Sequence, residues 1–206
     1  MKIYFVRHGQ TEYNVLHLHQ PETAELSKLG IKQAKILAKR FPKIPIDIIY
    51  SSPMKRAKQT AVIINKSLKK KIIYSNFLKE RKGPSEFLGK RKDSQEVFKI
   101  NKIRNLHEND SFWHYSNEEN FIEFKERVKK NFNVLSKTRK ENILVVTHGG
   151  PIKMMIFLMM GEEFTPQTFY KFSNLFKLNN TGITFCEKDK KGVWTVKAYN
   201  DHSHLG

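Results

Sequence analysis

The chain has 206 residues and a mass of 24.3 kDa, a length typical of one domain, and its hydrophobic fraction of 39% is too high for a disordered chain. Its 38 Lys and Arg residues exceed its 20 Asp and Glu residues, which gives a net charge of +18. That charge attracts anions in general, but says nothing about the fold. The single cysteine, Cys186, excludes an internal disulfide and provides no zinc pattern. Because no apolar run approaches the ~18 residues that span a bilayer, and no apolar leader begins the chain, we expect a cytoplasmic protein without membrane association.

The first third of the chain predicts strands that alternate with helices. Ser27 can cap a helix whose apolar positions recur at three-to-four spacing until Pro42. Ser52 followed by Pro53 is an N-cap and first-turn signal for a second helix, through Leu68. Short β-branched and aromatic runs predict strands at 2–6, 46–50 and 72–74.

Residues 76–117 lose this periodicity. The segment is basic, contains glycine and carries several aromatic residues. A long excursion of this kind within one domain is typical of a lid or substrate-facing insertion, here with a short helix at about 96–106.

The remainder returns to regular elements: an amphipathic helix at 121–135, a strand at 142–146, a Met-rich helix opened by Pro151 and a hairpin at 182–199. Strands that alternate with helices predict an α/β fold, three-layer α/β/α, with a mostly parallel central sheet closed by an antiparallel pair. We expect one domain over residues 1–206.

Cationic side chains follow three of the predicted strands. Arg7 and His8 end the first, Arg56 lies just past the second, and His148 follows the fourth. Parallel sheets bind ligands at the carboxyl ends of their strands, so these groups should converge. Two histidines and two arginines without cysteine suit a phosphoryl group better than a metal, because guanidinium groups grip phosphate oxygens. Either imidazole could act as a nucleophile if it is neutral.

Five ordered motifs carry a resemblance to a known family. RHGQTEYN at 7–14 resembles the RHGxTxxN signature of the histidine phosphatase superfamily, in its phosphoglycerate mutase-like branch. The segments that match further along the chain are 26–34, 51–61, 147–150 and 199–205. Together they cover nearly the whole chain, and the resemblance implies a phosphoglycerate mutase-like fold.

The resemblance also implies roles for individual residues. His8 would become phosphohistidine, while the phosphate would be bound by Arg7, Asn14, Arg56, His148 and Gly149. Glu80 would protonate the leaving oxygen and later deprotonate water. Glu86 remains an alternative for that acid, because the sequence after Glu80 departs from the pattern of the branch. No metal or other cofactor is implied, since cationic side chains supply the charge stabilisation.

The preferred function is a metal-independent phosphomonoesterase that acts on a small phosphorylated metabolite, as a monomer or homodimer. A cofactor-dependent phosphoglycerate mutase is an alternative, although no adjacent arginine pair lies between Glu80 and His148. A basic nucleic-acid-binding module is a second alternative, and we expect no specific nucleic acid, because no basic and aromatic platform is recognisable. The basic residues of the insertion could select a second anionic group or could be solvated; these are Lys82, Lys90, Arg91, Lys92, Lys99, Lys102 and Arg104.

Overall fold

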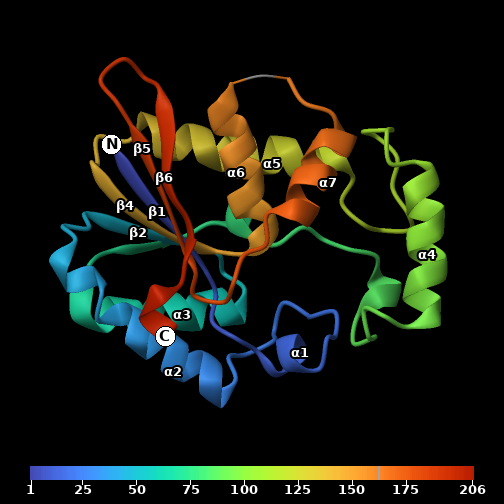
Figure 1. Cartoon of the computed structure of the whole chain (residues 1–206), viewed down its shortest axis with the longest axis horizontal. Helices are drawn as coiled ribbons and strands as arrows, with labels where there is room; N and C mark the ends of the chain where they lie inside the picture. Colours follow the sequence, from blue (N-terminus) through green and yellow to red (C-terminus); the bar gives the residue numbers. More distant parts are fainter. Residues whose placement is uncertain (162) are drawn as a thin grey trace.

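One six-stranded sheet organises the protein (Figure 1). The computed structural model describes residues 1–161 and 163–206. The strands of the sheet are β1 (Lys2–Arg7), β2 (Ile48–Ser51), β3 (Ile72–Tyr74), β4 (Asn142–Thr147), β5 (Ile183–Lys188) and β6 (Trp194–Asp201).

The strand order is β3-β2-β4-β1-β5-β6. The first four strands in this order are parallel, whereas β5 is antiparallel to both β1 and β6. Each parallel connection contains a helix, as parallel pairing requires. The prediction of a mostly parallel sheet closed by an antiparallel pair is therefore confirmed.

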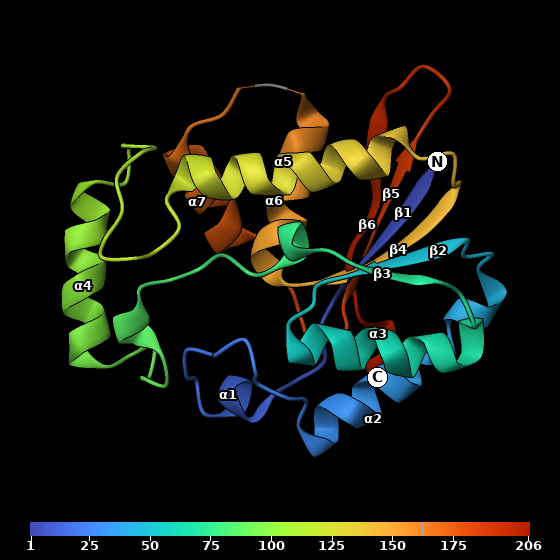
Figure 2. The ribbon, with the colours of Figure 1, turned by 180° about the vertical axis from the view of Figure 1, so that it is seen from behind.

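Helices cover both faces of the sheet (Figure 2). On one face lie α2 (Lys28–Ala38) and α3 (Lys55–Leu68), and on the other α5 (Phe121–Lys137) and α6 (Gly149–Met160), which α7 (Pro166–Leu175) packs against. Each face encloses its own hydrophobic core. Fully burying an aliphatic side chain stabilises a fold by about 1.5–3 kcal/mol, so both cores hold the strand ends rigidly. This arrangement confirms the three-layer α/β/α expectation.

The segment between β3 and α5 stands to one side of these layers (Figures 1 and 2). It contains α4 (Gln95–Leu106) and the 3₁₀ turns η2 (Asn76–Leu78) and η3 (Ser85–Phe87). The short helix expected at about 96–106 is thus confirmed. Smaller elements elsewhere are α1 (Glu12–Val15), η1 (Phe41–Lys43) and η4 (Ser203–Leu205).

One local prediction was wrong, and one helix was not predicted. Ser27 does cap α2, since its hydroxyl accepts from the Gly30 amide, but Ser52 does not cap α3. That helix begins at Lys55, after Met54, and the Ser52 hydroxyl instead lies 2.9 Å from Nε2 of His148. Helix α7 was not predicted, although Thr165 caps it and Pro166 occupies its first turn.

No helix in the described part of the chain is both long enough and apolar enough to cross a membrane.

Candidate active site

The two histidines meet because their strands are neighbours. β1 and β4 pair in parallel, with Arg7 opposite Thr147, and the His8 amide donates to the Thr147 carbonyl at 3.0 Å. Both imidazoles leave the sheet at the same edge, where their ring centroids lie 5.2 Å apart. His8 is 3% exposed and His148 is fully buried.

Hydrogen bonds fix the tautomer of His8. Its Nδ1 lies 2.8 Å from the Gly9 carbonyl oxygen, which can only accept, so Nδ1 carries the proton. In the neutral ring Nε2 then presents a lone pair, to which Arg56 Nε donates at 3.3 Å. Burial, followed by the charges of Arg56 and Arg7, lowers the pKa of His8 well below its usual value. The ring is therefore neutral at pH 7, and Nε2 carries no proton.

Arg56 reaches this nitrogen from the first turn of α3. It is 3% exposed, and its Nη1 donates to the Pro21 carbonyl at 2.9 Å. The Thr60 hydroxyl ties the helix to the β1 turn, because it donates to the Arg56 carbonyl and accepts from the Gly9 amide. Burial lowers the pKa of both Arg56 and Arg7, and Glu80 opposes this effect. Both remain cationic at neutral pH.

His148 is held by the serine that was expected to cap α3. Its Nε2 lies 2.9 Å from Ser52 Oγ, and both side chains are fully buried. Its Nδ1 is buried without a hydrogen-bond partner among the described residues. Burial, and then the charge of Arg56, lowers the pKa of His148 well below its usual value.

A segment that sequence reasoning missed wraps the end of β1. Arg7 donates from Nη1 to the Leu178 carbonyl, and its own carbonyl accepts from the Thr181 amide at 3.0 Å. The side-chain Nδ2 of Asn180 donates to the His8 carbonyl at 2.9 Å and to Asn14 Oδ1 at 3.4 Å. Neither Asn180 nor its neighbours belong to a sequence motif that could have indicated a role at the site.

Asn14 lies at the same cavity as His8 and Arg7. Its Oδ1 closes a capping box with Thr11, whose amide and hydroxyl both donate to it at 3.1 Å. The Oδ1 atom is thus engaged, and the donors of Nδ2 remain for a ligand. Gly149 opens α6 beside His148, with open space where a Cβ would lie.

Glu80 approaches from the loop after β3. Its Oε1 accepts from the amides of Arg81 at 3.0 Å and Gly150 at 3.1 Å. A Cβ on Gly150 would come within 2.3 Å of that oxygen, so glycine is required for this approach. Arg127 of α5 fixes the backbone of the loop by donating to the carbonyls of Phe77, Lys79 and Glu80 at 2.9, 3.0 and 3.4 Å.

A cavity of about 300 Å³ joins these groups, lined by Arg7, His8, Asn14, Arg56 and Glu80. His148 is fully buried and is not among the residues that line this cavity. Glu86, the alternative acid, is exposed and does not line the cavity, and hydrogen bonds from its own amide and from Ser116 lower its pKa.

The structure separates the basic residues of the insertion into two groups. Lys82, Lys92 and Arg104 line the cavity, although Arg104 is already neutralised by a bidentate pair with the buried carboxylate of Glu118. Partial burial and the charge of Arg7 lower the pKa of Lys92. Exposed Arg91 is paired with Asp93 outside the cavity.

Among the described residues, no three His, Cys, Asp or Glu side chains are grouped as metal ligands would be.

Comparison with known proteins identifies the family. The model of the histidine phosphatase superfamily (branch 1) matches residues 3–202. The metal-independent phosphoserine phosphatase of Arabidopsis thaliana is 29% identical over 99% of this chain and 83% of its own length. The broad-specificity phosphatase YOR283W of Saccharomyces cerevisiae is 27% identical over 100% of this chain and 88% of its own.

A solved structure has the same fold over the full length of this chain. The phosphoserine phosphatase of Entamoeba histolytica, crystallised as a histidine-to-alanine variant with phosphoserine, is 30% identical and superposes with a TM-score of 0.78, covering 100% of this chain and 99% of that one. The chain therefore belongs to branch 1 of the histidine phosphatase superfamily, and it is a phosphatase of that family.

Proposed function

We propose that the protein is a metal-independent phosphomonoesterase that hydrolyses a small phosphorylated metabolite through phosphohistidine at His8. The observation that carries this proposal is the state of the His8 ring. Its Nδ1–H donates to the Gly9 carbonyl, and its Nε2 lone pair accepts from Arg56 Nε at the cavity wall. A neutral imidazole beside guanidinium groups can attack phosphorus while the cations bind its oxygens.

In the first step Nε2 of His8 forms a bond to phosphorus, and the bond from phosphorus to the ester oxygen breaks. Arg7 and Arg56 offer N–H donors to the phosphoryl oxygens, and Asn14 offers Nδ2. His148 does not line the cavity, but its ring centroid lies 5.2 Å from that of His8. If the Ser52 hydroxyl donates to Nε2 of His148, its unpartnered Nδ1–H would be the donor to a phosphoryl group bound at His8. These cations do the work that Mg²⁺ performs in other phosphoryl transferases.

Glu80 is the proposed proton donor. In its protonated form it gives its proton to the leaving oxygen, and the resulting carboxylate then takes a proton from the water that attacks phosphohistidine. This step releases inorganic phosphate and restores neutral His8 and protonated Glu80. Glu80 is favoured over Glu86 because it lines the cavity, whereas Glu86 faces solvent.

The cavity also supports a class of substrate. Lys92 and Lys82 lie on its wall with no carboxylate within 4.0 Å among the described residues, which suits an alcohol that bears a second anionic group. Solved relatives from Entamoeba histolytica contain phosphoserine and 3-phosphoglyceric acid, both of which carry a carboxylate. We therefore propose small phosphorylated carboxylic acids as the first substrates to examine.

The test is covalent labelling with a ³²P-phosphorylated substrate in EDTA, followed by acid and alkali treatment. We expect an acid-labile, alkali-stable label that disappears in His8→Ala, together with phosphate release in the chelator. A full label in His8→Ala, or an absolute requirement for added Mg²⁺, would overturn the proposal. Assaying 3-phosphoglycerate isomerisation in parallel distinguishes the hydrolase from a mutase.

A further inference from the structure

The positive charge of the chain is concentrated in one helical layer. Residues 27–79, which contain α2 and α3, hold 14 Lys and Arg residues and a single acidic residue, Asp47. The carboxylate of Asp47 is already engaged, because it accepts from the amides of Glu141 and Asn142 at 2.9 Å. This quarter of the chain therefore carries +13 of the net charge of +18.

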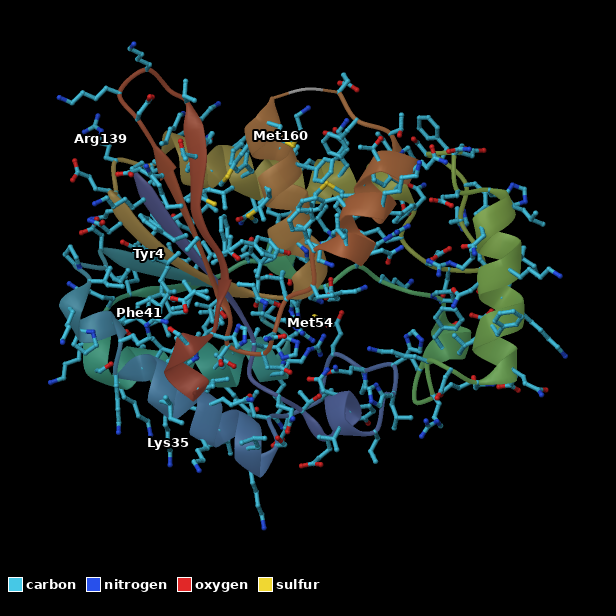
Figure 3. All side chains as sticks on the ribbon, in the orientation of Figure 1. Tyr4, Lys35, Phe41, Met54, Arg139 and Met160 are labelled. Carbon is cyan, nitrogen blue, oxygen red and sulfur yellow. The ribbon has the colours of Figure 1, made fainter. Side chains whose placement is uncertain are left out.

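Most of these cations point into solvent without a partner. Arg56 belongs to the active site, and Arg40, Lys55 and Lys79 pair with carboxylates. Ten others are exposed, and none of them pairs with a carboxylate in the described chain. Lys58 lies over the ring of Tyr74, 5.3 Å from its centroid. We call the other nine the basic face: Lys28, Lys32, Lys35, Lys39, Lys43, Lys66, Lys69, Lys70 and Lys71. Lys35 extends from α2 away from the sheet (Figure 3).

The basic face has a linear arrangement. Three lysines of α2 and Lys39 at its C-cap follow a 4-3-4 spacing, which places them on one side of the helix, opposite the buried Ala34 and Leu37. At 1.5 Å per residue they form a row about 16 Å long, with a cation roughly every 5 Å. The lysines after α3 directly precede β3, so they lie at the sheet edge opposite to the one that carries His8.

We propose that the basic face binds the phosphodiester backbone of nucleic acid without reading its sequence. A row of fixed cations matches a linear polyanion, and each phosphate that it neutralises releases counterions. The nine lysines include no aromatic or bidentate group that could read a base, so the contact is to the backbone. A membrane is the weaker match, because the exposed apolar residues of α2 and α3 are only Leu29, Ile31 and Val62, with no aromatic side chain to insert.

The experiment compares two variants of equal net charge by fluorescence anisotropy with a labelled duplex of about 20 base pairs. One replaces Lys32, Lys35, Lys66 and Lys70 of the basic face with Gln. The control replaces four exposed lysines elsewhere with Gln: Lys130, Lys171, Lys190 and Lys191. Salt is varied between about 50 and 200 mM, and a duplex of scrambled sequence is measured in parallel.

We expect the basic-face variant to bind at least ~10-fold more weakly and to lose about 2–4 units from the slope of log K against log salt, since each lysine contributes about 0.9. The control should stay within about 3-fold, both duplexes should bind equally, and phosphatase activity should be unchanged in both variants. Equal losses in the two variants would overturn the proposal, because net charge alone would then explain binding. Absence of duplex binding together with basic-face-dependent binding to vesicles of about 30% phosphatidylserine would assign the surface to membranes instead.

Discussion

Two regions line the same cavity in different ways: the sheet edge at the carboxyl ends of the parallel strands, and the excursion between β3 and α5. At the strand ends, His8, Arg56 and His148 are almost fully buried, and each is fixed by hydrogen bonds. In the excursion, Lys82 and Lys92 reach solvent and stand on turns and irregular backbone, although Lys92 is partly enclosed at the cavity wall. The sheet therefore provides the rigid half of the site, and the excursion provides a half that can vary without disturbing the core.

This difference suggests a division of labour. Phosphoryl transfer requires fixed charges aimed at a group that is common to all phosphomonoesters. Recognition of the alcohol requires groups that differ between substrates, and these are tolerated best on surface segments. Glu80 lies where the two regions join, since it belongs to the start of the excursion in sequence but its carboxylate accepts from the Gly150 amide of α6.

The largest effect is expected at the buried edge. Arg56→Gln should lower kcat/KM by about 10² to 10³ for every phosphomonoester, by analogy with the loss of an oxyanion donor. Aryl and alkyl esters should be affected alike, since the phosphoryl group is common to both. The matched control is Lys58→Gln, an exposed residue of the same helix, which should keep its activity. A loss confined to one class of alcohol would contradict the division.

Glu80→Gln should discriminate between leaving groups. Esters with poor leaving groups, such as glycerate phosphates, need protonation and should slow by about 10², whereas an aryl phosphate should slow by less than about 10-fold. Glu86→Gln is the control and should slow both classes slightly and equally. If the leaving-group dependence appears in Glu86→Gln, the acid assignment moves there while the phosphohistidine mechanism stands.

Acid should destabilise the buried edge itself. His8 and His148 have folded-state pKa values well below 6.5, so the unfolded state binds more protons as pH falls through that value. The free energy of unfolding should therefore fall by up to about 1.4 kcal/mol per pH unit for each histidine. Urea titrations at two pH values on either side of 6.5 should show a smaller acid loss in His148→Gln. Exposed His202→Gln is the control, and an acid loss equal to that of the wild type in His148→Gln would contradict this account.

The sequence predicted the rigid half of the site better than the variable half. His8, Arg56 and His148 follow strands, and parallel pairing brings strand ends together wherever the exact register falls. The sequence could not predict that Lys92 lines the cavity and that Arg91 does not. Irregular backbone has no periodicity from which the direction of a side chain could be inferred.

Two misses have local physical causes. Ser52 and Pro53 form a normal helix start, but the β2–β4 pairing places Ser52 against buried His148, and a buried imidazole without a partner costs more than an uncapped helix end. Asn180 contacts the His8 carbonyl only after β5 has paired with β1, a contact 172 positions apart in the chain that local patterns do not reveal.

A substitution at Arg127 tests whether α5 holds the Glu80 loop in place. Besides the three loop carbonyls, it forms a bidentate pair with Glu119 at 2.5 and 2.7 Å. Arg127→Met should release the loop of Glu80 and slow poor leaving groups by about 10- to 30-fold more than aryl phosphates, since misplacing the acid removes proton donation. Lys130→Met on the exposed side of α5 is the control. Equal slowing of both ester classes would mean that Arg127 supports the fold and does not position the acid.

The smallest effect is expected on the excursion. Lys92→Met should raise KM by about 5- to 10-fold for phosphorylated carboxylic acids and leave kcat nearly unchanged, because the lost attraction acts on the bound alcohol in ground and transition states alike. An aryl phosphate without a second anion should be almost unaffected. Lys99→Met, exposed on α4 and outside the cavity, controls for the loss of one charge near the site. The measurement is steady-state kinetics on the two substrates. A fall in kcat for both would mean that Lys92 takes part in phosphoryl transfer. The phosphoryl-transfer half of the site would then include part of the excursion.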